Sequence, residues 1–410
     1  MPAAGTVANV DRAHPGDRAR RPEARDGHLP AGDDGEVPLR AALDATPLLG
    51  QRSGVGRYVR GLVDGLAALP DGPDVLLTLF SIRGAVPGPL PARTRPAPRR
   101  APARLLRRAW RRTDWPPAEL LTGRVDLFHG TNFVVPPLAR AGGVVTVHDL
   151  AYLRYRETVT GDAAEYADLV PRALARGAYV VTPSEAVAEE VAAEYGLAAD
   201  RVGAAHHGVD PEWAQARPAS PADLRRLGLP DRYLVFLGNL EPRKNLGMLV
   251  RAHGAARRAD PDVPPLVLVG PAGWGDRWQG SPPDPRDVVT AGYLSDTDLH
   301  AVVAGAAAVC MPSHYEGFGL PVLEALAAGR PVLASDIPAH REVAAGQATF
   351  LPTDDADAWS AAFSALDDDT AAARARRAHA AAFTWEKSAR AHVRVYERAA
   401  HAARAARRSP

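Results

Sequence analysis

Two glutamates flank a short glycine-containing segment, Tyr315-Glu316-Gly317-Phe318-Gly319-Leu320-Pro321-Val322-Leu323-Glu324. Pro321 suits the first position of a helix, which should run over 322–328 and end at Gly329 as a left-handed cap. The glycines let backbone N–H groups approach a ligand, and a helix start favours an anion. Each carboxylate can accept hydrogen bonds from a pair of sugar hydroxyls. The segment therefore suits a ligand with a diol at each end and phosphates between them, as in a nucleoside diphosphate sugar.

The same two glutamates also have a plainer interpretation. Glu324 alone is an ordinary acidic residue in the first turn of a helix, and Glu316 alone is a solvated loop carboxylate. Other parts of the chain must distinguish the two interpretations.

A pair of cations provides the first test. Arg243 and Lys244, followed by Asn245, come after the apolar run 234–238 and open a predicted helix, so we expect them at the same edge of a sheet as the glutamates. Arg offers a planar fork to two phosphate oxygens and Lys a point charge, and together they can offset the charge of a leaving diphosphate. The alternative is a solvated basic pair, but cations near a helix N-terminus are locally unfavourable, which argues against it.

The first half of the chain adds a histidine and a glycine loop. His148 and Asp149 follow the predicted strand 143–147. A lone histidine is more often structural, but at a strand tip facing a cleft it favours function. Gly54 and Gly56 follow the first predicted strand, where their N–H groups can face the diphosphate from the opposite wall. That loop is weak evidence alone, since it lacks the full dinucleotide fingerprint and an acidic ribose partner.

Short apolar runs alternate with helical patterns along the chain, which predicts parallel sheets covered by helices on both faces. The fold class is therefore α/β, with two doubly wound, Rossmann-like domains and a ligand cleft at the strand ends. The predicted strands are 37–44, 75–80, 125–129, 143–147, 179–182, 234–238, 266–270, 288–292, 308–312 and 332–335. The predicted organisation is a disordered extension (1–36), an N-terminal domain (37–208), a linker (209–231), a C-terminal domain (232–384) and a helix (385–410) that packs back on the first domain.

Composition narrows the function classes. With 49 Lys and Arg against 48 Asp and Glu, the formal charge of +1 gives no overall attraction to nucleic acid. Cys310 is the one cysteine, so there is no intrachain disulfide and no cysteine-rich metal site; it lies in a predicted buried strand. No apolar run approaches the length of a membrane span, and the N-terminus lacks the apolar core of a signal peptide. We therefore expect a cytoplasmic protein.

Two further features each have two interpretations. Asp296 and Asp298 resemble a metal-binding pair, but Ser295 and Asp298 form a capping box ahead of a helix predicted over 299–307, so we expect no metal there. Residues 93–112 hold nine arginines and an apolar stripe of Leu105, Leu106, Ala109 and Trp110. That stripe predicts a peripheral contact with the cytoplasmic membrane face, the alternative being arginine stems that cover a helix while their heads stay solvated.

Together these motifs resemble the retaining glycosyltransferases of family 4, which share the GT-B fold, over about residues 37 to 400. The resemblance implies Glu324 on the nucleotide ribose, Glu316 on the donor sugar hydroxyls and the basic pair at the diphosphate. The catalytic set it implies is His148, Arg243, Lys244 and Glu316. The donor-binding set is Gly54, Gly56, Asn245, Tyr293, Leu294, Gly317, Phe318, Gly319, Leu320 and Glu324, and the acceptor-side or supporting set is Asp149, Arg57 and Ser184.

The resemblance also implies a reaction. A hexosyltransferase of this family moves a sugar from a nucleotide donor to a glycan or lipid-linked acceptor, with retained configuration and with neither a metal nor a cofactor. The Gly-Val-Gly-Arg-Tyr loop and the Val-Thr-Val-His-Asp-Leu strand look like bacterial mannosyltransferases of polysaccharide assembly, which suggests GDP-mannose. Alternatives are a UDP-sugar donor, a sugar-nucleotide epimerase, or a catalytically silent binding protein on the same fold.

Overall fold

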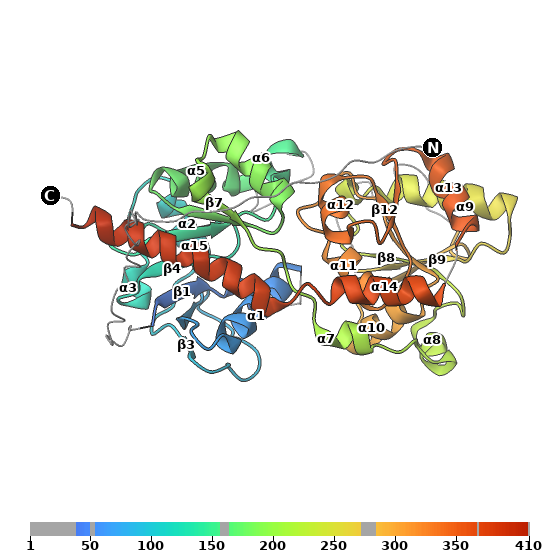
Figure 1. The fold of residues 1–410 in the computed structure, drawn as a ribbon, viewed down its shortest axis with the longest axis horizontal. Coiled ribbons are helices and arrows are strands. Elements are labelled where there is room, and N and C mark those ends of the chain that lie inside the picture. The colour runs from blue at the N-terminus through green and yellow to red at the C-terminus, as the bar shows by residue number, and fades with distance from the viewer. Residues whose placement is uncertain (1–37, 50–53, 156–163, 272–283, 367–368, 409–410) are drawn as a thin grey trace, which may run out of the picture. The chain divides into compact units, whose positions relative to one another are not determined.

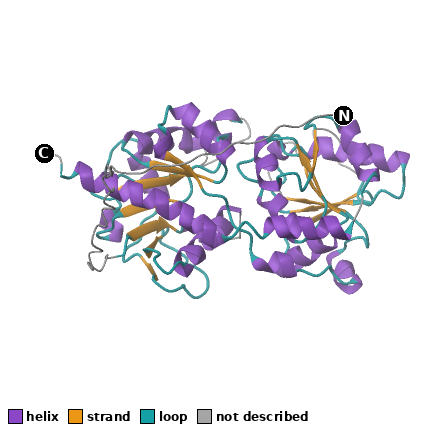
Figure 2. Cartoon of the chain, in the orientation of Figure 1, coloured by secondary structure: helices purple, strands orange, loops and turns teal. Residues whose placement is uncertain are grey.

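A computed structural model describes residues 38–49, 54–155, 164–271, 284–366 and 369–408. Helices lie on both sides of two sheets (Figures 1 and 2). We call the first sheet with its helices and the last helix of the chain the first half, and the second sheet with its helices the second half. The extension predicted over 1–36 and residues 50–53 of the predicted glycine loop lie outside the described residues.

Among the described residues, seven parallel strands form the first sheet in the order β3-β2-β1-β4-β5-β6-β7. These strands are mostly apolar and buried, as expected for a sheet covered on both faces. Their bounds are β1 (Arg40–Asp44), β2 (Asp74–Thr78), β3 (Thr94–Pro96), β4 (Leu127–Gly130), β5 (Gly142–Thr146), β6 (Tyr179–Thr182) and β7 (Val202–Ala204).

Helix α1 (Gly54–Ala68) buries one apolar side against the first sheet. On α1, residues Tyr58, Val59 and Leu62 are buried at helical spacing. The last helix, α15 (Trp385–Ala406), packs against α1 and β5, and its Val395 joins the same core cluster as Leu43 of β1 (Figure 1). The remaining bounds are α2 (Ala103–Trp110), α3 (Glu119–Thr122), α4 (Ala151–Arg154), α5 (Tyr166–Ala175) and α6 (Glu185–Tyr195).

The second sheet has six parallel strands within the described ranges, in the order β10-β9-β8-β11-β12-β13. Its strands are β8 (Leu234–Leu237), β9 (Leu266–Val269), β10 (Val288–Gly292), β11 (Ala308–Met311), β12 (Val332–Ser335) and β13 (Thr349–Leu351). Its helices are α7 (Pro211–Gln215), α8 (Pro221–Leu227), α9 (Leu246–Ala259), α10 (Asp296–Gly305), α11 (Leu320–Ala327), α12 (Pro338–Ala344), α13 (Ala356–Ser364) and α14 (Thr370–Ala380).

The order of the second sheet reverses between β8 and β11, which are neighbours. In open parallel sheets, the crevice outside the carboxyl ends of the strands at such a reversal is where ligands bind. The loop after β8 carries Arg243 and Lys244, and the loop after β11 carries Glu316. Fold topology alone therefore brings the two strongest sequence motifs to one place.

The predicted α/β class with two doubly wound sheets and a returning C-terminal helix is confirmed. Strands β6, β10 and β12 have the predicted bounds. Strands β3, β7 and β13 were not predicted, because each is three residues long and gives no apolar run to recognise. Gly54 and Gly56, predicted in a loop, lie in the first turn of α1, and α10 begins at Asp296 instead of Leu299.

Of the two aspartates, which lie in the first turn of α10, Asp298 takes part in the helix cap. Ser295 Oγ accepts from the Asp298 N–H over 3.2 Å, and Asp298 also pairs with Arg226 over 2.5 Å. Cys310 is fully buried in β11, and burial raises the pKa of its thiol. Among the described helices, none is long and apolar enough to cross a membrane.

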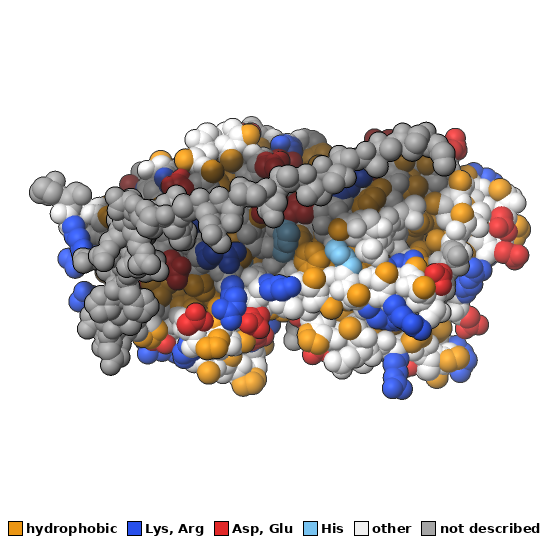
Figure 3. Space-filling view, viewed as in Figure 1, with side chains coloured by type: hydrophobic (Ala, Val, Ile, Leu, Met, Phe, Trp, Pro, Cys, Tyr) orange, Lys and Arg blue, Asp and Glu red, His pale blue; other side chains and the backbone are white. Residues whose placement is uncertain are grey.

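The predicted apolar stripe of the arginine-rich segment is partly buried in the core and partly exposed. Leu106 and Trp110 are buried in the core of the first half, whereas the Leu105 side chain is 69% exposed. The prediction of an exposed stripe was therefore wrong for Leu106 and Trp110, because this face of α2 packs into the hydrophobic core. On the face drawn in Figure 3, basic and acidic side chains are interspersed.

Candidate active site

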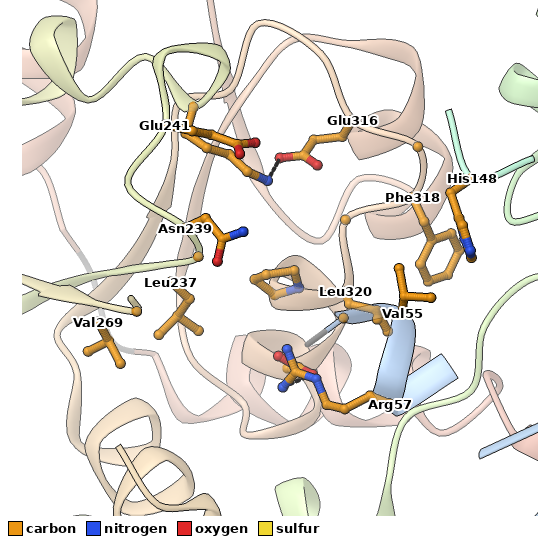
Figure 4. A pocket seen from close by; sticks show the side chains of 18 of the residues that line it. Val55, Arg57, His148, Leu237, Asn239, Glu241, Val269, Glu316, Phe318 and Leu320 are labelled. Atoms are coloured by element: carbon orange, nitrogen blue, oxygen red, sulfur yellow. Dashed lines mark hydrogen bonds and ion pairs between the residues drawn. The ribbon is translucent and has the colours of Figure 1, made fainter. Parts of the chain in front are cut away.

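One cavity of about 410 Å³ collects nearly all of the predicted site residues. It is lined by the loops after β8 and β11, by the start of α11, by the end of β5 and by the start of α1 (Figure 4). The predicted residues that line it are Gly54, Arg57, His148, Asp149, Arg243, Lys244, Tyr293, Leu294, Glu316, Gly317, Phe318, Gly319, Leu320 and Glu324.

The basic pair lies on a 3₁₀ turn over Pro242–Lys244, and α9 begins only at Leu246. The prediction that these cations open a helix was therefore wrong by a few residues. Asn245 has a positive φ of 55° between the turn and the helix, and its amide donates to the Thr353 carbonyl over 2.9 Å. Asn245 thus shapes the turn that presents Lys244, and it lies outside the cavity lining.

Glu316 is held by a cluster of donors. Lys244 Nζ lies 2.5 Å from Glu316 Oε1, Ser313 Oγ donates to the same oxygen over 2.7 Å, and Arg243 Nη1 lies 3.4 Å from Oε2. Burial alone would raise the pKa of Glu316, but Lys244 and Arg243 hold it well below its usual range. Glu316 is therefore a carboxylate at neutral pH, held in an ion pair with Lys244.

Arg243 is fixed at both ends of its guanidinium group. Nη1 donates to the Tyr315 carbonyl over 2.6 Å, and Nη2 donates to Glu241 Oε1 over 2.8 Å. Although burial favours the neutral form, Glu316 and nearby carboxylates raise the pKa of Arg243. This cation is both charged and rigidly oriented, which suits a planar contact with phosphate oxygens.

Glu324 meets a cation from the other half of the chain. Glu324 is the fifth residue of α11, and its carboxylate pairs with Arg57 Nη1 of α1 over 2.8 Å. Burial raises the pKa of Glu324, and Arg57 opposes that shift. Figure 4 shows Arg57 in a different part of the cavity from Glu316 and Glu241. The two glutamates of the opening motif therefore belong to two separate charged contacts.

His148 is neutral and has one defined tautomer. Its Nε2 lies 2.9 Å from the Thr131 carbonyl, and because a carbonyl only accepts, Nε2 carries the hydrogen and Nδ1 is an acceptor. Burial lowers the pKa of His148. Asp149 accepts from the Ala151 N–H over 2.9 Å and so shapes the chain after β5. A neutral His148 can accept a hydrogen bond from a sugar hydroxyl.

The loop between the glutamates touches the first half of the chain directly. A Cβ on Gly317 would lie 1.9 Å from the His148 carbonyl oxygen, so only glycine fits there. Ser184, the N-cap of α6, donates from Oγ to the Gly317 carbonyl over 2.7 Å. Gly319 has a φ of 100° and caps α11, so the turn into the helix also requires glycine.

Three predicted residues lie outside the cavity lining, and several unpredicted ones lie inside it. Gly56 is buried in the first turn of α1, Ser184 acts through Gly317, and Asn245 acts through its turn. The unpredicted polar lining residues are His207, Asn239, Glu241 and Asp296. Glu241 stands two residues before Arg243, separated from the basic pair only by Pro242, so its place beside the motif could have indicated it. His207 packs between Tyr58 and Phe318, which only the fold brings together.

The cavity combines features that suit a nucleotide sugar. Two cations, Arg243 and Lys244, stand at the topological reversal, where a diphosphate can bind. Two carboxylates that can accept from hydroxyl pairs line the cavity, Glu316 beside Lys244 and Glu324 beside Arg57. Two parallel sheets with such a cavity define the GT-B architecture of nucleotide-sugar transferases.

Comparisons with known proteins agree with that class. Residues 231–369 match a family model described as "Glycosyl transferases group 1", and residues 52–213 match "Glycosyltransferase Family 4". The chain is 31% identical over 287 residues to the O-antigen chain mannosyltransferase B of Escherichia coli, which covers 66% of this chain and 74% of the relative. The chain belongs to glycosyltransferase family 4.

Two further proteins illustrate the range of the relatives. The D-inositol 3-phosphate glycosyltransferase of Saccharomonospora viridis is 31% identical over 62% of this chain, and the chain spans 64% of that relative, less than two thirds. The structure of a sucrose-phosphate synthase from Thermosynechococcus elongatus superposes with a TM-score of 0.63 at 21% identity, over 89% of this chain and all of that one. At such identity the likeness concerns the fold alone.

Proposed function

We propose that this chain transfers a hexosyl group, mannose from GDP-mannose, to a glycan or lipid-linked acceptor in the assembly of a cell-surface polysaccharide or glycoconjugate. The observation that carries the proposal is the buried cluster of Arg243, Lys244 and Glu316 at the reversal between β8 and β11. The sugar is suggested by the printed name of one relative, a mannosyltransferase. The shared family supports the reaction type.

The cluster gives each residue a part in transfer. Arg243 and Lys244 contact the diphosphate and stabilise the charge that develops as its bond to the anomeric carbon breaks. Glu316 then shares its donors with the phosphates and accepts from sugar hydroxyls. The acceptor oxygen bonds to the same face of the sugar, its proton passes to the departing phosphate oxygen, and configuration is retained. We propose that this step needs no divalent cation.

An assay of several donors tests this function. With GDP-mannose as donor, we expect release of GDP and unchanged turnover after addition of EDTA, because Arg243 and Lys244 stabilise the diphosphate. UDP-glucose and UDP-N-acetylglucosamine serve as comparison donors, and nuclear magnetic resonance of the product gives the anomeric configuration. Loss of activity with EDTA that a divalent ion restores would contradict metal-independent transfer, and an inverted product would contradict retention.

The alternatives give different results in the same assay. A UDP-sugar transferase releases UDP and leaves GDP-mannose intact. An epimerase changes the sugar without releasing a nucleotide, and a silent binding protein binds donors without turnover. The cluster favours turnover over silent binding, since all three of its charged groups, Arg243, Lys244 and Glu316, are present.

A peripheral membrane contact of residues 93–112 also stays a proposal. Exposed Arg104, Arg108 and Arg112 follow one another at four-residue spacing and form no ion pair with any described residue, beside exposed Leu105 and Trp115. Basic side chains next to apolar ones suit an anionic lipid surface.

Vesicle sedimentation tests that contact. We expect binding to phosphatidylglycerol vesicles, little binding to phosphatidylcholine vesicles, and a loss of at least about 30-fold in the Arg104→Glu and Arg108→Glu double variant, since each basic residue contributes roughly 1 kcal/mol. Arg251→Glu, an exposed change on α9, is the matched charge control. Equal binding to both lipids would contradict the contact.

A further inference from the structure

Tyr315 directly precedes Glu316, yet its side chain enters the other half of the chain. The hydroxyl donates to Glu190 Oε2 of α6 over 2.7 Å and accepts from the Leu150 N–H over 2.9 Å. The residue is 9% exposed. The tip of a second-half side chain is therefore bonded to the chain segment that carries His148.

The Tyr315 ring is also held from its sides. The Tyr155 ring stacks on it with centroids 5.7 Å apart, and the Arg154 guanidinium carbon lies 5.4 Å from its centroid. Arg154 in turn pairs with Glu190 over 2.9 Å. Burial raises the pKa of the Tyr315 phenol, so the hydroxyl keeps its proton at neutral pH. These contacts leave the side chain one orientation.

The backbone of Tyr315 belongs to the charged cluster. Its carbonyl accepts from Arg243 Nη1 over 2.6 Å, and the next residue, Glu316, pairs with Lys244. The hydroxyl and the carbonyl of one residue thus connect the Leu150 amide to the Arg243 guanidinium. Any change in the position of the ring moves one of these groups relative to the other.

Two further contacts near Tyr315 also join the second half to the first. Ser184 donates to the Gly317 carbonyl, and Gly317 lies against the His148 carbonyl with no room for a side chain. On α12, Glu342 accepts from the backbone N–H groups of Glu185 over 2.7 Å and Ala186 over 3.0 Å. The loop after β11 is therefore docked on the first half along its length, with Tyr315 as the buried side chain at its start.

We propose that Tyr315 is a positioning residue for sugar transfer, whose hydroxyl sets the separation between His148 and the diphosphate-facing cations. This inference rests on the proposed function. Tyr315 does not line the cavity, so it acts through the residues that it connects. Transfer depends on placement of reacting groups within fractions of an ångström, whereas the charged groups proposed to bind the donor, Arg243, Lys244 and Glu324, all belong to the second half.

Tyr315→Phe tests this role because it removes only the hydroxyl. We expect kcat to fall about 10- to 100-fold, the range associated with displacements of about an ångström. The donor Kd, measured by calorimetry with GDP-mannose, should change less than about threefold, since Arg243, Lys244 and Glu324 remain. Amide hydrogen exchange at Leu150 should become faster, a readout that does not depend on turnover.

Tyr152→Phe is the matched control. The Tyr152 hydroxyl is also buried and lies 2.7 Å from the Tyr195 hydroxyl, but both residues belong to the first half. We expect kcat, Kd and exchange at Leu150 to stay at wild-type values in this variant. An equal loss of kcat in Tyr152→Phe would overturn the proposal, because any buried hydroxyl would then have the same effect.

Two variants of Glu190 test the same role if Tyr315→Phe fails to fold. Glu190→Gln keeps an acceptor for the Tyr315 hydroxyl and should keep kcat, whereas Glu190→Ala should lower it. Unchanged kcat in Tyr315→Phe, or a fall in kcat matched by an equal rise in Kd, would overturn the positioning role. A wild-type protein that binds none of the donors would overturn the proposed function itself.

Discussion

Replacing Lys244 by alanine should lower kcat for sugar transfer by about 10²- to 10³-fold, the loss typical of removing one group that stabilises developing charge. Lys244 Nζ is the nearest cation to Glu316 and lies on a fixed turn at the reversal of the second sheet. Without it, Arg243 alone faces the departing diphosphate. The measurement is product release at saturating donor, compared with the wild-type protein.

The fold should survive the loss of Lys244. Arg243 and Ser313 still contact Glu316, so its carboxylate is not left alone in the interior. Arg257→Ala is the matched control, because it removes an ion pair with Asp287 in the same half but outside the cavity. Circular dichroism should show folded protein for both variants. Turnover of Lys244→Ala within about threefold of wild type would contradict the assigned role.

Replacing Glu324 by alanine should raise KM for the donor by about 10²- to 10⁴-fold and change kcat less. A carboxylate that accepts from two ribose hydroxyls forms hydrogen bonds worth about 1.5–3 kcal/mol each, and these bonds are made equally before and during transfer. An interaction that stabilises the bound donor and the transition state equally changes KM and leaves kcat nearly unchanged. Steady-state kinetics with GDP-mannose give both constants.

A deoxyribose donor provides the control for Glu324. If the carboxylate contacts the ribose, removing the 2′-hydroxyl from the donor should raise KM in the wild-type protein and add little in Glu324→Ala. Additive losses would contradict a contact between them. Glu324→Ala also releases Arg57 from its 2.8 Å ion pair, so Arg57→Ala is measured alongside to separate the two effects.

Donor binding should also depend on pH through Glu324. Burial raises the pKa of this carboxyl above its usual range, so it takes up a proton at a higher pH than an exposed glutamate does. The protonated form is a weaker acceptor, so KM should rise as pH falls toward and through this raised pKa. Glu324→Gln cannot titrate and should lose that dependence.

The sequence predicts the fold and the collection of motifs well because both depend on local patterns. Continuous apolar runs mark the buried strands, and parallel strand ends bring Arg243, Lys244 and Glu316 together by topology alone. The pairing of individual charged side chains cannot be predicted in this way. The contact of Arg57 with Glu324 joins α1 to α11, and nothing near either residue in sequence indicates the partner.

Asn245 and Tyr315 show that the direction of a side chain is harder to predict than its place in the chain. Asn245 follows the basic pair and was predicted to bind the donor, but a left-handed backbone turns its amide toward Thr353. Tyr315 was predicted only as the first residue of a motif, since its partners Leu150 and Glu190 come from distant strands and helices. Side-chain direction depends on tertiary packing, which a pattern of residue types does not encode.

The return of α15 to the first sheet has a consequence for biosynthesis. Tyr396 and Ala399 complete a core cluster that also contains Leu43 and Leu62. During synthesis, the strands of the first sheet leave the ribosome early, whereas α15, which covers one side of their core, leaves it late. The second half, whose cluster ends at Ala380, can therefore reach its final packing before the half that precedes it in sequence, the reverse of the usual order of synthesis.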